Sequence, residues 1–88
     1  MKILVTGGSG FIGTNYIDYA KKRGAEILNI DIVLPHRAED KSSYINCNIM
    51  DRERLISIIT DFKPTHVVHL AAKTGAHSIT DIREFAPN

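Results

Sequence analysis

A glycine-rich segment near the start of the chain has the residue types and spacing of a phosphate-binding loop. Residues 6–13 read Thr-Gly-Gly-Ser-Gly-Phe-Ile-Gly, in which Gly8, Gly10 and Gly13 satisfy the spacing G-x-G-x-x-G. With Gly7 in place of Gly8, the same segment satisfies G-x-x-G-x-x-G. One glycine permits a tight strand-to-helix turn, one lets the backbone approach a pyrophosphate, and the last lets the helix pack closely on the strand. The start of that helix then offers backbone N–H groups and a partial positive charge to phosphate.

An acidic residue follows this loop at the distance that dinucleotide-binding proteins use. Asp31 ends a predicted strand 18 residues after Gly13, near the roughly 20 residues of the dinucleotide fingerprint. A carboxylate there accepts hydrogen bonds from both ribose hydroxyls of an adenosine and repels a 2′-phosphate, which favours NAD over NADP. Two alternatives stay open. Asp31 could serve only as a turn residue. His36 and Arg37 are near enough in the sequence to keep NADP as an alternative, but neither directly follows the strand.

Other combinations of reactive side chains predict neither catalysis nor metal binding. His66 and His69 are three residues apart in a predicted strand, so they point to opposite faces and cannot share a metal ion. The single cysteine, Cys47, is expected to be a small buried apolar residue. No Gly-Lys-Ser/Thr follows the loop, which excludes a Walker A site. S-adenosylmethionine binding also uses a glycine-rich loop and an acidic strand end, but the third glycine at the helix start argues against it.

Apolar patterning predicts that strands and helices alternate along the chain. Strands are predicted from short apolar runs at residues 3–5, 25–31, 44–49 and 65–72. Residues 32–43 show no periodicity and are predicted to be a surface connection. A last helical turn is predicted from Ser78 onward. This order, β-α-β and then a second β-α-β, predicts an α/β fold with a Rossmann-type parallel sheet of strand order 3-2-1-4.

Two helices are predicted from apolar residues at helical spacing. The first presents Ile12, Tyr16, Ile17 and Ala20 on one face, and Gly24 ends it. The second presents Leu55, Ile58, Ile59 and Phe62. Asp51 is the predicted N-cap of the second helix, and Pro64 stands just past its end.

Composition sets broad limits on partners and location. The chain has 88 residues, of which 43% are hydrophobic and 24% charged, with a net charge of +1, and this describes one small globular unit. Such a balanced charge predicts no nucleic-acid partner and no binding to anionic membranes. No apolar run approaches the roughly 20 residues that span a bilayer, and we expect no signal peptide. A lone cysteine favours a reducing compartment, so we expect a cytoplasmic protein.

Five features taken together resemble the N-terminal part of an extended short-chain dehydrogenase/reductase. They are the Thr6–Gly13 loop, Asp31, the Asn48–Asp51 turn, the His69–Ala72 segment and Asn88. The group is the NAD-dependent epimerase/dehydratase family, most members of which act on nucleotide-activated sugars. The resemblance extends over all 88 residues.

The resemblance implies a set of residues that contact the cofactor NAD. At the loop, the residues that would line the pyrophosphate are Gly7, Gly10, Phe11, Ile12 and Gly13. Asp31 would hold the adenosine ribose. Asn48 and Ile49 match a family pair that touches adenine, and Asn48 replaces the usual aspartate there, so its amide carbonyl would accept from the adenine amino group.

The resemblance also assigns a segment late in the chain to the cofactor. Leu70, Ala71 and Ala72 match the stretch that passes the cofactor ribose, where small residues allow close approach. Lys73 would reach phosphate or ribose. Without the resemblance, Leu70–Ala72 would be ordinary strand core and Lys73 a solvated cation.

Family chemistry depends on a Tyr-x-x-x-Lys motif, which this sequence lacks, because no tyrosine is followed four residues later by lysine. We therefore assign no catalytic residue and expect residues 1–88 to be the N-terminal portion of a NAD(P)-binding Rossmann domain. A larger, intact enzyme would transfer hydride to and from a carbon of a nucleotide-sugar substrate. Any homodimer would form through parts outside this chain. The alternative is a non-catalytic dinucleotide-binding module that acts as a sensor or a scaffold.

Overall fold

A computed structural model describes residues 1–71 of the chain. The elements within this range are β1 (Lys2–Thr6), α1 (Phe11–Lys22), β2 (Glu26–Asp31), the 3₁₀ helix η1 (Ala38–Ser43), β3 (Tyr44–Asn46), α2 (Arg52–Phe62) and β4 (His66–His69). The helical turn predicted from Ser78, together with Ala72, Lys73 and Asn88, lies outside the described residues.

The strands form one parallel sheet in the order β3-β2-β1-β4, which confirms the predicted order. The central strand is β1, in which Ile3 pairs with Ile27 of β2 on one side and His66 of β4 on the other. All four carboxyl ends therefore lie at one edge of the sheet. The strand order changes direction between β1 and β4, and this is where ligands bind in open α/β sheets.

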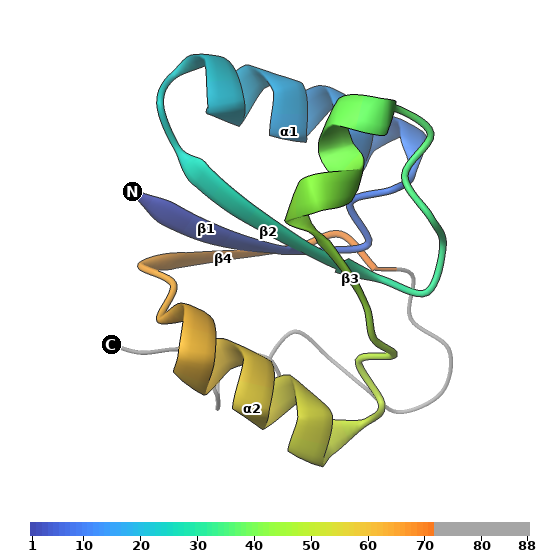
Figure 1. Cartoon of the computed structure of the whole chain (residues 1–88), viewed down its shortest axis with the longest axis vertical. Coiled ribbons are helices and arrows are strands. Elements are labelled where there is room, and N and C mark those ends of the chain that lie inside the picture. Colours follow the sequence, from blue (N-terminus) through green and yellow to red (C-terminus); the bar gives the residue numbers. More distant parts are fainter. Residues whose placement is uncertain (72–88) are drawn as a thin grey trace.

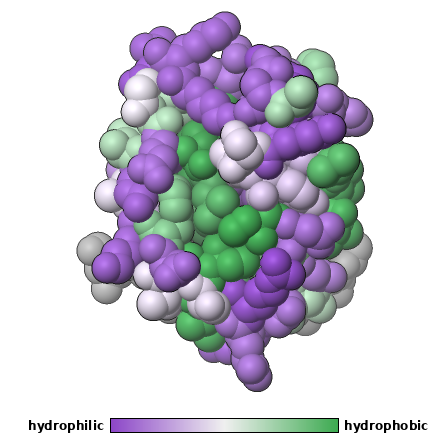
Figure 2. All heavy atoms as spheres, viewed as in Figure 1, coloured by the Kyte–Doolittle hydropathy of each residue, from purple (hydrophilic) through white to green (hydrophobic). Residues whose placement is uncertain are grey.

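The sheet lies between α1 on one face and α2 on the other (Figure 1). Alternate residues of β1 point to opposite faces and so enter two separate cores. On the α1 face the buried residues are Ile3, Val5, Ile17, Ala20 and Ile27. On the α2 face they are Leu4, Ile30, Cys47, Leu55 and Ile59. Figure 2 shows hydrophilic residues over α1 and η1 and apolar residues gathered in the middle of the same face. No helix within residues 1–71 is long and apolar enough to cross a membrane.

Helix α1 packs Tyr16, Ile17 and Ala20 on its buried face, as predicted, but not Ile12. Ile12 was expected on the buried face, yet it is 69% exposed, and the prediction is wrong at this position. The buried residues of the helix are Gly13, Ile17 and Ala20. Gly13 takes the place on this face nearest the loop, and a pattern built from apolar side chains does not detect a glycine.

Helix α2 confirms its predicted cap and its predicted face. Asp51 is the N-cap, and its Oδ1 accepts a hydrogen bond from the Arg54 N–H at 3.3 Å. Leu55 and Ile59 are buried. The helix ends at Lys63, whose φ of 54° is left-handed, and the buried Pro64 follows.

Strand β3 is shorter than predicted because a turn follows it directly. After Cys47 donates its N–H to the carbonyl of Asp31 at 3.1 Å, pairing with β2 stops. The Asn48 side chain then accepts the Met50 N–H at 2.9 Å, and the Asn48 carbonyl accepts the Asp51 N–H at 2.9 Å. These two bonds close a turn that leads into α2. Strand β4 is likewise shorter, with His66–His69 in place of the predicted 65–72.

The connection between β2 and β3 is more ordered than predicted. Residues Ala38–Ser43 form η1, and Asp40 within it is only 4% exposed. Residues 38–43 lie mostly at the surface, as predicted, but the helical conformation and the buried Asp40 were not predicted. An ion pair between Asp40 and Lys21 attaches η1 to α1, and this pairing is not visible in the local sequence.

Candidate functional site

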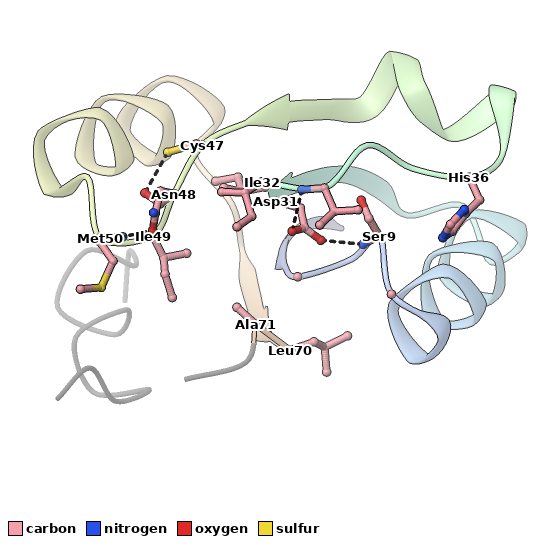
Figure 3. A pocket seen from close by; sticks show the side chains of 14 residues that line it. Ser9, Asp31, Ile32, His36, Cys47, Asn48, Ile49, Met50, Leu70 and Ala71 are labelled. Carbon is pink, nitrogen blue, oxygen red and sulfur yellow. Dashed lines mark hydrogen bonds between the residues drawn. The ribbon is translucent and has the colours of Figure 1, made fainter. Parts of the chain in front are cut away.

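A cleft of about 590 Å³ opens at the carboxyl ends of the strands. Its walls come from four segments, within residues 7–10, 30–36, 47–50 and 70–71. Each segment follows or ends a different strand of the sheet. In the view of Figure 3, Asn48 and Met50 lie at one end of the cleft, Ser9 and His36 at the other, and Asp31 between them. Such a concave site at the change in strand order is the usual ligand site of an α/β sheet.

Gly7 makes the turn that leaves β1 and the close approach to the segment after β4. Its φ is +71°, a left-handed value that favours glycine. A Cβ atom on Gly7 would lie 2.6 Å from the Cα of Ala71. Any side chain at Gly7 would therefore push apart two walls of the cleft.

Gly8 and Gly13 pack against each other where α1 begins. A Cβ atom on Gly13 would lie 2.5 Å from the Cα of Gly8. Gly13 was expected to let the helix approach the strand, but its nearest neighbour is the loop backbone. Its role is to bring the first turn of α1 onto the loop.

Among the glycines of the loop, Gly10 is the one that borders open space. It lines the cleft, and the nearest atom to a Cβ built on it is the Gly7 carbonyl oxygen at 3.9 Å. Gly10 is also the N-cap of α1, with no side-chain cap, and the first turn of the helix has no acidic residue. The first bond of the helix runs from the Thr14 N–H to the Gly10 carbonyl at 2.9 Å. The N–H groups before Thr14 have no partner within the helix, so this end of α1 suits an anion.

Asp31 is held at the middle of the cleft by two backbone donors. Its Oδ2 accepts the Ser9 N–H at 3.0 Å, and its Oδ1 accepts the Val33 N–H at 3.1 Å (Figure 3). A carboxylate oxygen can accept more than one hydrogen bond. Both oxygens can therefore still accept a hydroxyl donor from a ligand, and their orientation is already fixed.

The turn after β3 forms the far end of the cleft. Asn48 and Ile49 line it, and the Asn48 Oδ1 already accepts the Met50 N–H. The adjacent Cys47 is 2% exposed, which confirms the prediction of a buried thiol. Burial raises the pKa of the Cys47 thiol. Cys47 therefore forms part of the apolar floor of the cleft, and we do not expect its thiol to act as a nucleophile.

Of the other residues that were predicted to contact the cofactor, some line the cleft and some lie outside it. Leu70 and Ala71 line the cleft. Phe11 and Ile12 stand on the first turn of α1 and are 85% and 69% exposed, outside the cleft lining. The last two predicted residues, Ala72 and Lys73, lie outside the described residues.

Several residues of the cleft were not predicted from the sequence. Ile32 and Val33 line it and are 62% and 52% exposed, and Met50 lines it at 49% exposure. Ser9 lines it as well, and so does His36, which the sequence had suggested only in connection with NADP. A signal was present, since three apolar residues follow Asp31 where the strand has already ended. Exposed apolar residues beside a cleft are more typical of a binding site than of a connection.

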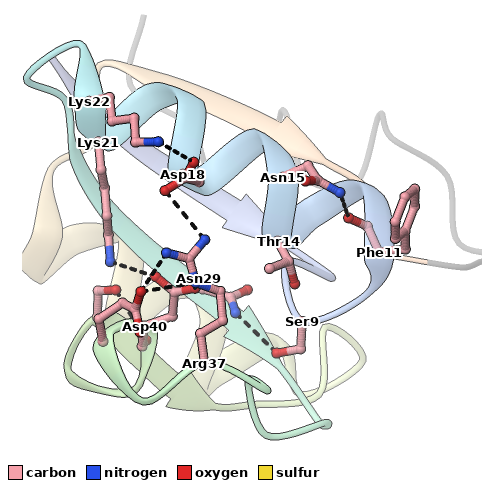
Figure 4. Close-up of polar contacts among 12 residues, drawn as sticks. Ser9, Phe11, Thr14, Asn15, Asp18, Lys21, Lys22, Asn29, Arg37 and Asp40 are labelled. Carbon is pink, nitrogen blue, oxygen red and sulfur yellow. Dashed lines mark hydrogen bonds and ion pairs between the residues drawn. The ribbon is translucent and has the colours of Figure 1, made fainter.

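Arg37, one of the two cations considered for NADP, is engaged elsewhere. Its guanidinium pairs with Asp18 of α1 at 3.3 Å and also with Glu39 and, at 3.9 Å, with Asp40 (Figure 4). Arg37 is not part of the cleft lining, whereas His36 is. These acidic partners hold Arg37 against α1, outside the cleft, so we do not expect it to bind a phosphate there.

The two strand histidines make separate contacts. His66 Nδ1 lies 2.9 Å from the Thr65 hydroxyl, and His69 Nδ1 lies 2.6 Å from the Thr6 hydroxyl. Within residues 1–71, no three histidine, cysteine, aspartate or glutamate side chains gather closely enough to hold a metal ion.

Solved structures of two NAD complexes have the same fold over the part that matches this chain. The NAD complex of Thermus thermophilus UDP-glucose 4-epimerase matches with a TM-score of 0.72 and 34% identity, over 84% of this chain and 25% of that one. The Bordetella bronchiseptica enzyme WbmG, in complex with NAD and UDP, matches with a TM-score of 0.69 and 40% identity, over 84% of this chain and 26% of that one.

Sequence comparison leads to the same group of proteins. UDP-glucose 4-epimerase of Mycolicibacterium smegmatis is 32% identical over 92% of this chain and 28% of its own length. The chain thus spans little more than a quarter of the curated relatives that it matches first. The model of the NAD dependent epimerase/dehydratase family matches residues 3–88. The chain therefore belongs to the NAD dependent epimerase/dehydratase family.

Proposed function

We propose that this chain binds NAD and forms the adenosine and pyrophosphate half of the cofactor site of a nucleotide-sugar epimerase or dehydratase. The observation that carries the proposal is the position of Asp31, which is held in the cleft by the Ser9 N–H of the phosphate-type loop. A carboxylate next to such a loop suits the ribose of NAD and disfavours a 2′-phosphate.

The described residues fit the proposed cofactor. The open space beside Gly10 and the uncapped start of α1 leave room and N–H donors for a pyrophosphate. Asp31 would accept the ribose hydroxyls, and the apolar side chains of Ile32 and Ile49 would contact adenine. Ala72 and Lys73 are proposed to extend the same site, in agreement with their family positions. When bound, NAD supplies a hydride acceptor.

Calorimetric titration of the chain with NAD and with NADP tests the proposal. We expect NAD to bind and NADP to bind at least about tenfold more weakly, a difference of about 1.4 kcal/mol. Of the two residues considered for NADP, His36 lines the cleft and Arg37 does not. Equal affinity for the two dinucleotides would contradict the assignment of Asp31, and no heat with either would contradict the proposal as a whole.

The activity of the whole protein is a separate part of the proposal. We infer that it transfers hydride between NAD and a carbon of a nucleotide sugar, with catalytic groups supplied from outside these 88 residues. The test is to assay the longest protein that carries this sequence for NAD-dependent conversion of UDP- and dTDP-hexoses. NAD binding without turnover of any nucleotide sugar would support the non-catalytic module instead. The cytoplasmic location stays a prediction.

A further inference from the structure

A buried amide lies directly beneath the glycine-rich loop. Asn29 of β2 is a polar residue, yet it is only 1% exposed. The residues on either side of it, Leu28 and Ile30, are apolar and pack in the core on the α2 face. Its Oδ1 accepts the Gly8 N–H at 2.9 Å, and its Nδ2 donates to the Ser9 hydroxyl at 3.2 Å. Ser9 is itself 1% exposed. An amide is stable at such a buried position only when its hydrogen bonds are satisfied, as they are here.

Three consecutive residues of β2 hold three consecutive N–H groups of the loop. The Gly7 N–H bonds to the Ile30 carbonyl at 2.9 Å, and the Gly8 N–H bonds to the Asn29 side chain. The Ser9 N–H bonds to the Asp31 carboxylate at 3.0 Å. Figure 4 shows the Asn29 side chain directed at Ser9. The same loop residue, Ser9, thus connects Asn29 to Asp31.

The fit between Asn29 and the loop leaves no spare room. A Cβ atom on Gly8 would lie 2.5 Å from the Asn29 Oδ1. The amide therefore sets the distance between the loop and the strand. Asn29 is not part of the cleft lining, whereas Ser9, Gly10 and Asp31 are, so it acts on the cleft only through them.

We propose that Asn29 is a positioning residue for the dinucleotide. It fixes the loop at Gly8 and Ser9, and through Ser9 it fixes the Asp31 carboxylate relative to the anion-binding start of α1. This inference rests on the proposed NAD binding. Asn29 thereby contributes to both the affinity for NAD and the preference for NAD over NADP.

The decisive variant is Asn29→Leu, which keeps the size of the side chain and removes both hydrogen bonds. Calorimetric titrations with NAD and NADP are made at a temperature where circular dichroism shows each variant folded. We expect NAD to bind about tenfold more weakly, and the NAD/NADP affinity ratio to fall because Asp31 is no longer held. A purely structural role would lower the melting temperature and leave the affinity and the ratio unchanged.

Ile59→Val is the matched control, because Ile59 is 3% exposed in the core on the opposite, α2 face of the sheet. It should lower the melting temperature and leave the NAD affinity at the wild-type value. If Asn29→Leu does not fold, Ser9→Ala replaces it, since this change removes only the acceptor of the Asn29 Nδ2. We expect about threefold weaker NAD binding and faster hydrogen exchange at the Gly8 amide in Ser9→Ala.

Each outcome decides the inference. Wild-type affinity and selectivity in folded Asn29→Leu, or wild-type affinity and Gly8 exchange in Ser9→Ala, would overturn the positioning role alone. Loss of NAD affinity in Ile59→Val equal to that in Asn29→Leu would overturn it too, because the effect would then follow stability. Absence of NAD binding by the wild-type chain would overturn the proposed function and this inference together.

Discussion

Lys21 Nζ lies 3.0 Å from the Oδ1 of Asp40, and the Asp40 side chain is only 6% exposed. The pair connects the last turn of α1 to η1, and η1 leads back to β3 (Figure 4). The same connection carries Ile32 and His36, which line one wall of the cleft. We therefore expect the ion pair to help position that wall.

Replacing Lys21 with methionine should destabilise the fold. The change leaves a buried carboxylate with Arg37, at 3.9 Å, as its remaining ion-pair partner, and we expect a loss of about 1–3 kcal/mol in urea unfolding. Lys22→Met is the matched control, because Lys22 pairs with Asp18 and its side chain is 76% exposed. The control should cost clearly less, because an ion pair with so exposed a partner contributes little to stability. Equal losses in the two variants would contradict a special role for Asp40.

Gly10→Val should remove NAD binding without unfolding the protein. The space beside Gly10 is open to the cleft, and its φ of −79° is accessible to valine. Gly13→Ala should instead lower stability by about 1–3 kcal/mol, because the new methyl group would overlap the backbone of Gly8. Calorimetry and thermal melting measure the two effects separately. Retained NAD affinity in folded Gly10→Val would show that the phosphates bind elsewhere.

Asp31→Ala should weaken NAD binding more than NADP binding, because the carboxylate both accepts ribose hydroxyls and repels a 2′-phosphate. It also removes the acceptor for the N–H groups of Ser9 and Val33. Asp61→Ala, an exposed aspartate of α2, is the control and should bind both dinucleotides like the wild type. An equal loss for NAD and NADP in Asp31→Ala would place the ribose away from this carboxylate.

Stability should fall in acid as the surface carboxylates of α1 and η1 become protonated. The hydrogen bond from Lys22 lowers the pKa of Asp18, and the hydrogen bond from Arg37 lowers the pKa of Glu39. Since the folded-state pKa values lie below the unfolded ones, the carboxylates stabilise the fold above about pH 4. That stabilisation is lost as the pH falls through the folded-state values. Urea unfolding between pH 7 and pH 3 should show a shallower decline in Asp18→Asn than in the wild type.

Cys47 should react slowly with thiol reagents in the folded protein. Burial raises the pKa of its thiol, so less thiolate is present at pH 8 than at an exposed cysteine. As the single cysteine of the chain, it gives one labelling rate by mass spectrometry. Labelling should accelerate in urea and slow further with NAD, because Cys47 lines the cleft. Fast labelling of the folded chain would mean that the floor of the cleft opens readily.

The sheet and its order could be predicted from the sequence because strands buried on both faces leave continuous apolar runs. Val67 and Val68 illustrate this, since the first packs on the α2 core and the second on the α1 core. Once α/β alternation is established, few orders of the strands remain. The prediction was wrong where a contact between distant residues decides the structure, as at Asp40, which is buried because Lys21 pairs with it.

The segments that form the cleft could be predicted better than the contacts that each residue makes there. The spacing of the glycines identifies the loop, but the contact between Gly8 and Gly13 appears only when the helix is placed. Asn48 was expected to face adenine, but its side-chain Oδ1 also accepts the Met50 N–H and so closes the turn. Asn29 carried no sequence signal, because a single polar residue in a strand gives no indication of the loop above it.

The central position of β1 has a consequence for the order of folding. Ile3 pairs with Ile27, which is close in the chain, whereas Thr6 meets His69 across 63 residues. Closing the longer connection costs more chain entropy, so we expect the β1-α1-β2 unit to assemble first and β4 to join last. The loop and Asp31 would then be in place early. The wall formed by Leu70 and Ala71 would complete the cleft only in the final step.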